Sequence, residues 1–372
     1  MVVGVIDGVR PYGVFSVGGA APRVGVRVGE GVVDLAAALG DDVFARPSLN
    51  AFMAQGPRRW AEVRSLVAEL DTSYPLTEVT LYRPVEIADY VDFYASEQHA
   101  SNLGRLYRPN SPPLLPNWKH LPVGYHGRAG TVVVSGTEIV RPCGQLATPD
   151  GPVFGPSRRL DIEAELGFVV GVGGARITPD AFAEHVFGVV VVNDWSARDI
   201  QSWEYAPLGP FLGKSFATSI SPWVTPLAAL DAARIATPRR DPEPLPYLRG
   251  TEPWGLDIEL TVCWNGQLVS RPPYAGMYWS PAQMLAHLTA NGAAARTGDL
   301  FASGTVSGPA RDQRGSCIEL TWNGAEPIDI AGAPRSFLED GDEVVIAATA
   351  PGPDGTRIEL GDVRGRIRPA RR

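Results

Sequence analysis

The segment 160–167 carries three acidic residues, each separated from the next by one apolar residue. On a β-strand, Asp161, Glu163 and Glu165 would share one face, while Ile162 and Ala164 would point to the other. Like charges along one face repel each other, so water or a bound cation has to compensate them. The pattern leaves two interpretations open. One is a solvated edge strand, and the other is a site for a hard divalent ion such as Ca²⁺ or Mg²⁺, which prefers oxygen ligands.

Two other segments carry residues that suit the same chemistry. Residues 90–99 place Asp92 seven positions before His99, among several aromatic residues. Residues 187–201 begin as an apolar strand and end in a dense polar cluster that includes Asp194. A buried strand that ends in polar residues can present them at the rim of a site. Taken alone, a histidine such as His99 is more commonly structural, and Asp194 is equally compatible with a helix N-cap or a turn.

Several longer motifs resemble those of the fumarylacetoacetate hydrolase family. The matching segments are Asp92-Phe93-Tyr94, Gln98-His99-Ala100, Leu115–Trp118, His120–Arg128, Asn193–Gln201, Trp203–Tyr205, Pro207–Phe216, Ala302–Gly308, Gly315–Leu320 and Asp340–Val344. They extend over the chain beyond about residue 85, and the first part is a fainter match to the small SH3-like domain of the family. The resemblance implies hydrolysis of the carbon–carbon bond of 4-fumarylacetoacetate to fumarate and acetoacetate, which is the last step of tyrosine and phenylalanine catabolism.

The resemblance also implies a role for each matching residue. The metal-binding positions that it implies are Asp92, Glu163, Glu165, Asp194, Lys214 and Thr218. The catalytic positions are His99, Glu319, Arg198, Gln201 and Lys214. The substrate-binding positions are Tyr94, Arg108, Tyr125, Gln201, Tyr205 and Thr305. In this scheme a histidine base is oriented by a carboxylate, and the expected cofactor is Ca²⁺, Mg²⁺ or both.

These residue types fit the expected reaction. Water is a poor nucleophile at neutral pH, so a base is needed, and a carboxylate behind a histidine fixes its tautomer and stabilises the imidazolium. The oxyanion that forms needs fixed donors, and a divalent ion would stabilise an enolate leaving group. Two alternatives stay open. The chain could be a hydrolase or decarboxylase for another β-diketo acid or acylpyruvate, or a metal-stabilised binding or scaffold protein.

The pattern of the chain predicts a mainly β (α+β) fold. From the resemblance we expect a small SH3-like β-barrel domain over residues 1–80, followed at 85–372 by a large mixed β-sandwich or roll catalytic domain of the fumarylacetoacetate hydrolase type. A helix is predicted over residues 48–70 from apolar spacing, and another after the capping box at Ser280. The predicted strands include 131–134, 160–170, 185–192, 256–264, 317–322 and 343–347. Asn-Gly pairs at 265–266 and 323–324 predict hairpins.

Composition excludes several other classes. The 372 residues have a formal charge of −8, which argues against a nucleic-acid-binding protein. There are three cysteines, too few and too far apart for a disulfide framework or a CxxC zinc site. No apolar run approaches the roughly 20 residues that span a membrane. We therefore expect a soluble cytoplasmic protein. The resemblance implies an enzyme with a small β-diketo dicarboxylate substrate and a homodimer.

Overall fold

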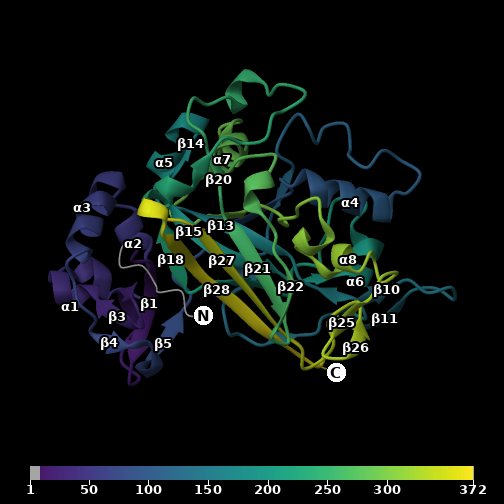
Figure 1. Cartoon of the computed structure of the whole chain (residues 1–372), viewed down its shortest axis with the longest axis horizontal. Helices are drawn as coiled ribbons and strands as arrows, with labels where there is room; N and C mark the ends of the chain where they lie inside the picture. Colours follow the sequence, from purple (N-terminus) through teal and green to yellow (C-terminus); the bar gives the residue numbers. More distant parts are fainter. Residues whose placement is uncertain (1–8, 372) are drawn as a thin grey trace.

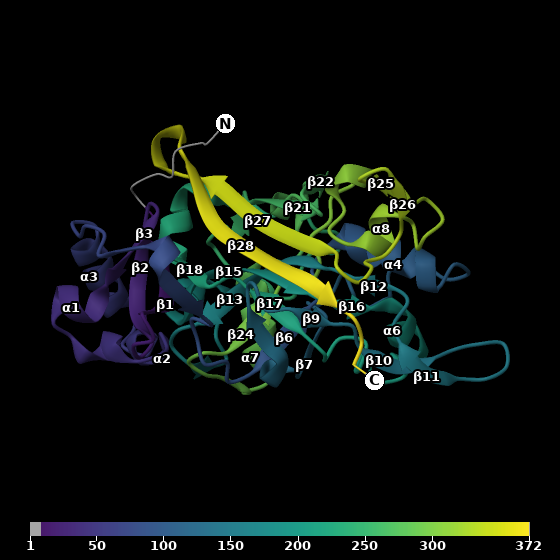
Figure 2. The same cartoon turned by 90° about the horizontal axis from the view of Figure 1, so that it is seen from below.

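The computed structural model describes residues 9–371, and Figures 1 and 2 show a molecule built mainly of β-sheet. The predicted mainly β fold is confirmed. Residues 1–8 of the predicted N-terminal domain and residue 372 of the predicted catalytic domain lie outside the described part. Within residues 9–371, no helix is long and apolar enough to cross a membrane.

The N-terminal elements form a small curved sheet with three helices beside it (purple and blue in Figure 1). The strands are β1 (Tyr12–Val17), β2 (Arg23–Val28), β3 (Gly31–Asp34), β4 (Tyr74–Pro75) and β5 (Val79–Tyr82). The helices are α1 (Leu35–Leu39), α2 (Asn50–Met53) and α3 (Pro57–Val67). Strand β1 pairs with β2, with β5 and with β18 (Trp223–Pro226), so the small sheet continues into the large one.

The large sheet has the order β18-β15-β13-β24-β6-β7. Its strands are β15 (Val186–Asp194), β13 (Ala164–Val170), β24 (Leu300–Ala302), β6 (Tyr90–Phe93) and β7 (Gly124–His126), with β17 (Thr218–Ile220) beside the end of β15 and β8 (Val132–Val134) beside β17. All nine residues of β15 are buried. Val189 and Val191 contribute to one apolar core, and Val190 and Val192 contribute to the other, as the period of two requires.

A second sheet packs on the first and closes the larger core. Its order is β22 (Gln267–Ser270), β21 (Glu259–Trp264), β27 (Glu343–Pro351), β28 (Arg357–Arg368) and β9 (Ile139–Val140). Strands β27 and β28 are the long yellow pair in Figure 2, and β28 contacts β15. The short strands are β10 (Cys143–Leu146), β11 (Val153–Pro156), β12 (Leu160–Asp161), β14 (Gly174–Ala175), β16 (Ser196–Ala197), β19 (Arg234–Ile235), β20 (Gly255–Leu256), β23 (Ala294–Ala295), β25 (Ile328–Ile330) and β26 (Ala333–Arg335).

Five further helices lie around these sheets: α4 (Glu97–Tyr107), α5 (Phe182–His185), α6 (Arg198–Glu204), α7 (Pro281–Thr289) and α8 (Cys317–Leu320). Helix α7 has the predicted capping box, with Ser280 accepting from the Gln283 amide. The Asn265-Gly266 pair connects β21 to β22 with positive φ at both residues, as predicted for a type I′ hairpin.

Five local predictions are wrong or incomplete. The helix expected over 48–70 is two helices, because Gly56 adopts φ 85° and Pro57 starts α3. The strand expected over 160–170 is interrupted between β12 and β13, and the strand expected over 256–264 is interrupted between β20 and β21. Residues 317–320 form helix α8 instead of a strand, because Asp161 accepts the backbone amides of its first two residues. The Asn323-Gly324 pair has positive φ at both residues, but it follows this helix and makes no hairpin.

Candidate active site

Four carboxylates meet at one edge of the large sheet. Their ligand atoms lie within 4.8 Å of one another, and the four residues are Asp92, Glu163, Glu165 and Asp194. Strand register explains the convergence, since β6, β24, β13 and β15 are neighbours and three of the acids lie on these strands. Glu163 lies in the interruption between β12 and β13. The solvated-edge interpretation of the acidic segment is therefore wrong, because Asp161, Glu163 and Glu165 are all buried.

Three cationic side chains contact this cluster. Arg128 donates from Nη1 to both oxygens of Asp194, at 2.8 and 2.9 Å, and from Nη2 to Asp92 at 2.8 Å. Lys214 binds Glu163 and lies 2.8 Å from Asp194. Arg198 lies 2.8 Å from Glu163. Three cations against four carboxylates leave one negative charge uncompensated when all four acids are ionised.

The environment separates the pKa values of the four acids. Burial, reinforced by Asp194 and opposed by Arg128, raises the pKa of Asp92 to about 7. Burial and Asp92 hold the pKa of Glu165 well above its usual range. Burial also opposes ionisation of Glu163 and Asp194, but their cationic neighbours outweigh it and hold both pKa values below the usual range. Two of the acids thus resist ionisation unless more positive charge is supplied.

The cluster fits a divalent ion. Asp92 Oδ1 and Glu165 Oε1 are buried, and neither has a hydrogen-bond partner in the described part of the chain. Buried carboxylate oxygens without a partner are costly, and a cation among them removes that cost. An all-oxygen donor set suits Mg²⁺, Ca²⁺ or Mn²⁺ better than a soft metal. Thr218, predicted for this region, lies opposite Asp194 on β17 and donates to its Oδ1 at 2.7 Å.

His99 and Glu319, 220 positions apart, form a buried pair beside the cluster. His99 Nδ1 lies 2.7 Å from Glu319 Oε2. A carboxylate can only accept, so Nδ1 carries the proton and Nε2 is free to accept one. Nε2 lies 3.8 Å from Glu163 Oε1, too far for a hydrogen bond. Ser96 caps α4 and accepts from the His99 amide, so the cap sets the histidine in the first turn of the helix.

Glu319 is held from several sides. It accepts hydrogen bonds from Asn102 at 2.9 Å, Ser307 at 2.9 Å and Ser316 at 2.7 Å. Burial opposes its ionisation, but His99 and these donors keep the pKa of Glu319 below its usual range. The residue therefore stays a carboxylate and can stabilise a positive charge on the imidazole.

A cavity of about 530 Å³ opens over the cluster and His99. All predicted substrate-binding residues line it: Tyr94, Arg108, Tyr125, Gln201, Tyr205 and Thr305. Arg198 and Lys214 line it as well, whereas Glu319 lies behind His99, and Glu165, Asp194 and Thr218 lie deeper. Arg108 Nε, Arg198 Nη2 and Thr305 Oγ1 are buried, and none has a described partner. These atoms are donors available to an anionic or carbonyl-bearing ligand.

Several residues of the site had no predicted role. Arg128 lies in a segment that carried the resemblance, but only the structure shows that it contacts the cluster. Asp161 binds Arg198 Nε at 2.7 Å and accepts from the backbone amides of Cys317 and Ile318, so it joins Arg198 to the start of α8. Asn102 and the two serines around Glu319 carry no pattern in the sequence that marks them.

A deep carboxylate cluster beside a carboxylate-supported histidine, on two packed mixed sheets, defines a hydrolase that activates water. Two family models match the chain, Fumarylacetoacetase N-terminal over residues 10–80 and Fumarylacetoacetate (FAA) hydrolase C-terminal over residues 89–368. The chain belongs to the fumarylacetoacetate hydrolase family, and it is an enzyme of the class that hydrolyses carbon–carbon bonds.

Curated relatives match nearly the whole chain. Fumarylacetoacetase of Homo sapiens is 45% identical, over 97% of this chain and 95% of the relative. The protein of the same name from Arabidopsis thaliana is 42% identical, over 97% and 94%. Among solved structures, fumarylacetoacetate hydrolase from Exiguobacterium antarcticum has a TM-score of 0.59 at 18% identity, over 97% of this chain and 100% of that chain. Maleylpyruvate hydrolase from Sphingobium sp. SYK-6, in complex with manganese(II) and pyruvate, has a TM-score of 0.57 at 16% identity, over the same shares. The structural matches show the shared fold.

Proposed function

We propose that this protein hydrolyses 4-fumarylacetoacetate to fumarate and acetoacetate, as the last step of tyrosine and phenylalanine catabolism. The carrying observation is the His99–Glu319 pair, which faces a four-carboxylate cluster inside one cavity. Relatives named fumarylacetoacetase, 40–45% identical over 97% of the chain, support this substrate over another acylpyruvate. They equally argue against the binding-protein alternative, since the proposed catalytic groups are all present.

In the proposed mechanism His99 acts as the general base. Its Nε2 accepts a proton from water, and the hydroxide oxygen forms a bond to the ketone carbon of the fumaryl group, which becomes a carboxyl carbon of fumarate. Glu319 holds Nδ1 protonated and stabilises the imidazolium that results. The carbon–carbon bond then breaks, its electron pair forms the enolate of acetoacetate, and the imidazolium returns the proton to the enolate carbon. The net reaction consumes one water.

The donors in the cavity have two tasks. The oxyanion is stabilised by Arg198, Gln201 and Lys214. Removal of one such donor typically raises the barrier by roughly 3–4 kcal/mol. The dicarboxylate substrate is bound and oriented by Arg108, Tyr94, Tyr125, Tyr205 and Thr305. When bound at Asp92, Glu163, Glu165 and Asp194, a divalent ion supplies Lewis-acid stabilisation of the diketone oxygens. We propose Ca²⁺ or Mg²⁺ for this position, with Lys214 and Thr218 beside it.

Several properties of the whole protein are part of the same proposal. We infer a homodimer in the cytoplasm, with domains at 1–80 and 85–372. Size-exclusion chromatography with light scattering tests the dimer, because a monomer at working concentration would contradict it.

The test of function is the loss of ultraviolet absorbance of fumarylacetoacetate on mixing with purified, metal-supplied protein. His99→Ala should abolish turnover while metal binding, measured by isothermal titration calorimetry, is retained. His120→Ala, at an exposed histidine outside the cavity, is the matched control and should keep full activity. Absence of turnover by the unmodified protein, or faster turnover of an acylpyruvate than of fumarylacetoacetate, would contradict the proposal.

A further inference from the structure

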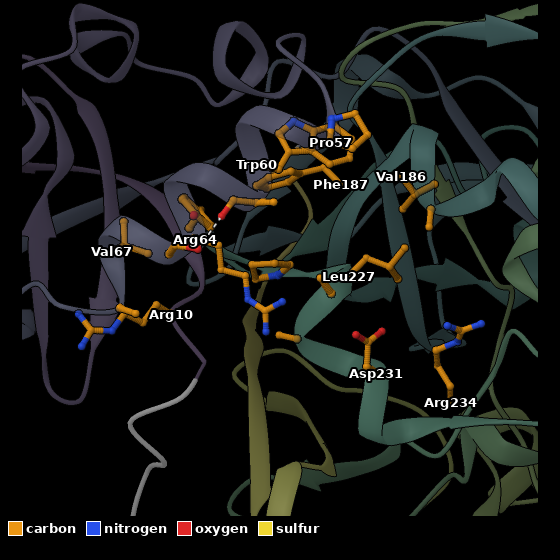
Figure 3. Close-up of a pocket in the computed structure, with 18 of the residues that line it drawn as sticks. Arg10, Pro57, Trp60, Arg64, Val67, Val186, Phe187, Leu227, Asp231 and Arg234 are labelled. Atoms are coloured by element: carbon orange, nitrogen blue, oxygen red, sulfur yellow. Dashed lines mark hydrogen bonds between the residues drawn. The ribbon is translucent and has the colours of Figure 1, made fainter.

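A second large cavity lies between α3 and the segment that follows β18. Its volume is about 600 Å³, within the range of small-molecule sites. One wall is α3 with Tyr12 of β1, and the other is the start of β15 with the 3₁₀ helix Leu227–Ala233 (η5). Figure 3 shows these walls facing each other across the cavity. Phe187 at this cavity and Asp194 at the carboxylate cluster are seven residues apart on β15, or about 23 Å along the strand. The two cavities are therefore separate.

The inner surface of this cavity is aromatic and apolar. Trp60 and Phe187 meet edge to face, with ring centroids 5.4 Å apart, and Tyr12 lies 5.5 Å from Phe187. The Trp60 indole N–H donates to the carbonyl of Met53 at 2.9 Å, so the ring is fixed in orientation. A rigid aromatic wall of this kind favours a flat apolar ligand, because ring edges and faces pack without loss of side-chain freedom.

One cation in this cavity stands apart from the others. Arg10 donates to the carbonyl of Leu70, and Arg234 pairs with Glu252 while covering the Trp254 ring at 4.1 Å. Arg64 reaches from α3 into the middle of the cavity, and its guanidinium makes no ion pair or hydrogen bond with any side chain or backbone group that the structure describes. A guanidinium binds a carboxylate through two parallel hydrogen bonds.

Tyr12 adds an independent polar group. Its side chain is 2% exposed and lines the cavity. The hydroxyl can donate a hydrogen bond to a ligand oxygen at this position. Asp231 on the opposite wall limits the negative charge of the ligand, since it would repel a second carboxylate.

We propose that this cavity binds a small aromatic monocarboxylate. The ring packs between Trp60, Phe187 and Leu227, and the carboxylate binds Arg64. Such a ligand contacts both α3 and η5, so its binding also stabilises their packing. The expected ligand charge differs from that of the active-site cavity, for which a dicarboxylate substrate is proposed.

The test is isothermal titration calorimetry of the full-length, metal-loaded protein with indole-3-acetate. We expect a dissociation constant below about 1 mM. Binding of the neutral isostere indole-3-acetamide should be at least tenfold weaker. Arg64→Gln should weaken the binding of indole-3-acetate at least tenfold without changing enzyme turnover. Arg58→Gln, at an exposed arginine of the same helix outside the cavity, is the matched control and should bind normally.

A second variant makes the location falsifiable. Ala228→Phe places a ring into the cavity from an exposed position of η5 and should abolish binding while the protein keeps its melting temperature. Equal affinity for the acid and the amide would overturn the proposal, as would absence of binding. Binding that survives both Arg64→Gln and Ala228→Phe but is lost in Arg108→Gln would place the ligand in the active-site cavity instead, and would equally overturn it.

Discussion

Glu319→Gln removes one negative charge behind His99 and keeps the size of the side chain. In the native protein four donors converge on this carboxylate, from His99, Asn102, Ser307 and Ser316. A glutamine oxygen at the Oε2 position keeps the bond from His99, but its amide nitrogen then faces the Asn102 nitrogen, donor against donor. The fold should lose about 1–3 kcal/mol of unfolding free energy for this one mismatch.

The loss of catalysis should be larger than the loss of stability. The imidazolium that forms when His99 takes a proton no longer has an anionic partner. General-base catalysis contributes roughly 10²–10⁴-fold, so we expect kcat to fall by up to this factor, which corresponds to a barrier higher by about 2.7–5.4 kcal/mol. KM should change little, because Glu319 does not line the cavity.

The assay is the loss of substrate absorbance, with calorimetric metal titration alongside. Glu326→Gln is the matched control, since this acid is exposed and pairs only with Arg311. We expect Glu319→Gln to bind the metal normally and to turn over slowly. A kcat within threefold of the native value would refute the role of Glu319, and a joint loss of metal affinity would refute the division between base and metal site.

Three further predictions concern the carboxylate cluster. Arg128→Gln should cost the metal-free protein about 3–5 kcal/mol of unfolding free energy, because buried Asp92 loses its ion-pair partner and Asp194 keeps only Lys214. Urea denaturation with and without divalent metal should show that the ion restores part of this loss. The pKa of Asp92, about 7, lies above that of a free aspartate, so protons compete with the metal below neutrality. The affinity for the metal should therefore fall up to tenfold per pH unit from pH 7 to 6. Calorimetric metal titration in two buffers should detect proton release at pH 6. Gly304→Ala should lose at least about 2 kcal/mol, because φ is 74° and a Cβ would lie 2.2 Å from the Phe93 carbonyl oxygen; thermal melts that match the native protein would contradict this.

The prediction from sequence succeeded where a pattern has a direct physical meaning. The apolar run that ends at Asp194 forms a buried strand, and the capping box at Ser280 starts a helix as its hydrogen-bonding chemistry requires. The alternation of acids found Glu163 and Glu165 but left their environment open between solvent and a cation site, because periodicity identifies a face and does not say what covers it. In this protein the face is covered by cations from other segments, such as Lys214.

Other parts of the site lie beyond local pattern. The pairing of His99 with Glu319 came only from family resemblance, since nothing in residue spacing brings α4 and α8 together. The strand predicted at 317–322 is a helix because Asp161 accepts the amides at its first turn, a tertiary contact that no window of sequence contains. Arg128 acts on the cluster from a loop residue with φ of 70°, a conformation that sequence does not predict for arginine.

Strand β15 separates two apolar cores and forms a wall of each. Neither core can melt while the other stays intact, because loss of the strand from one side exposes the alternate valines on the other. The molecule should therefore unfold in a single transition, despite its length and its two sheets. Asp194 ends this strand, so it reaches its final position only when both cores have formed. Metal capture is thereby delayed to the end of folding, and a partly folded chain offers the ion no complete site.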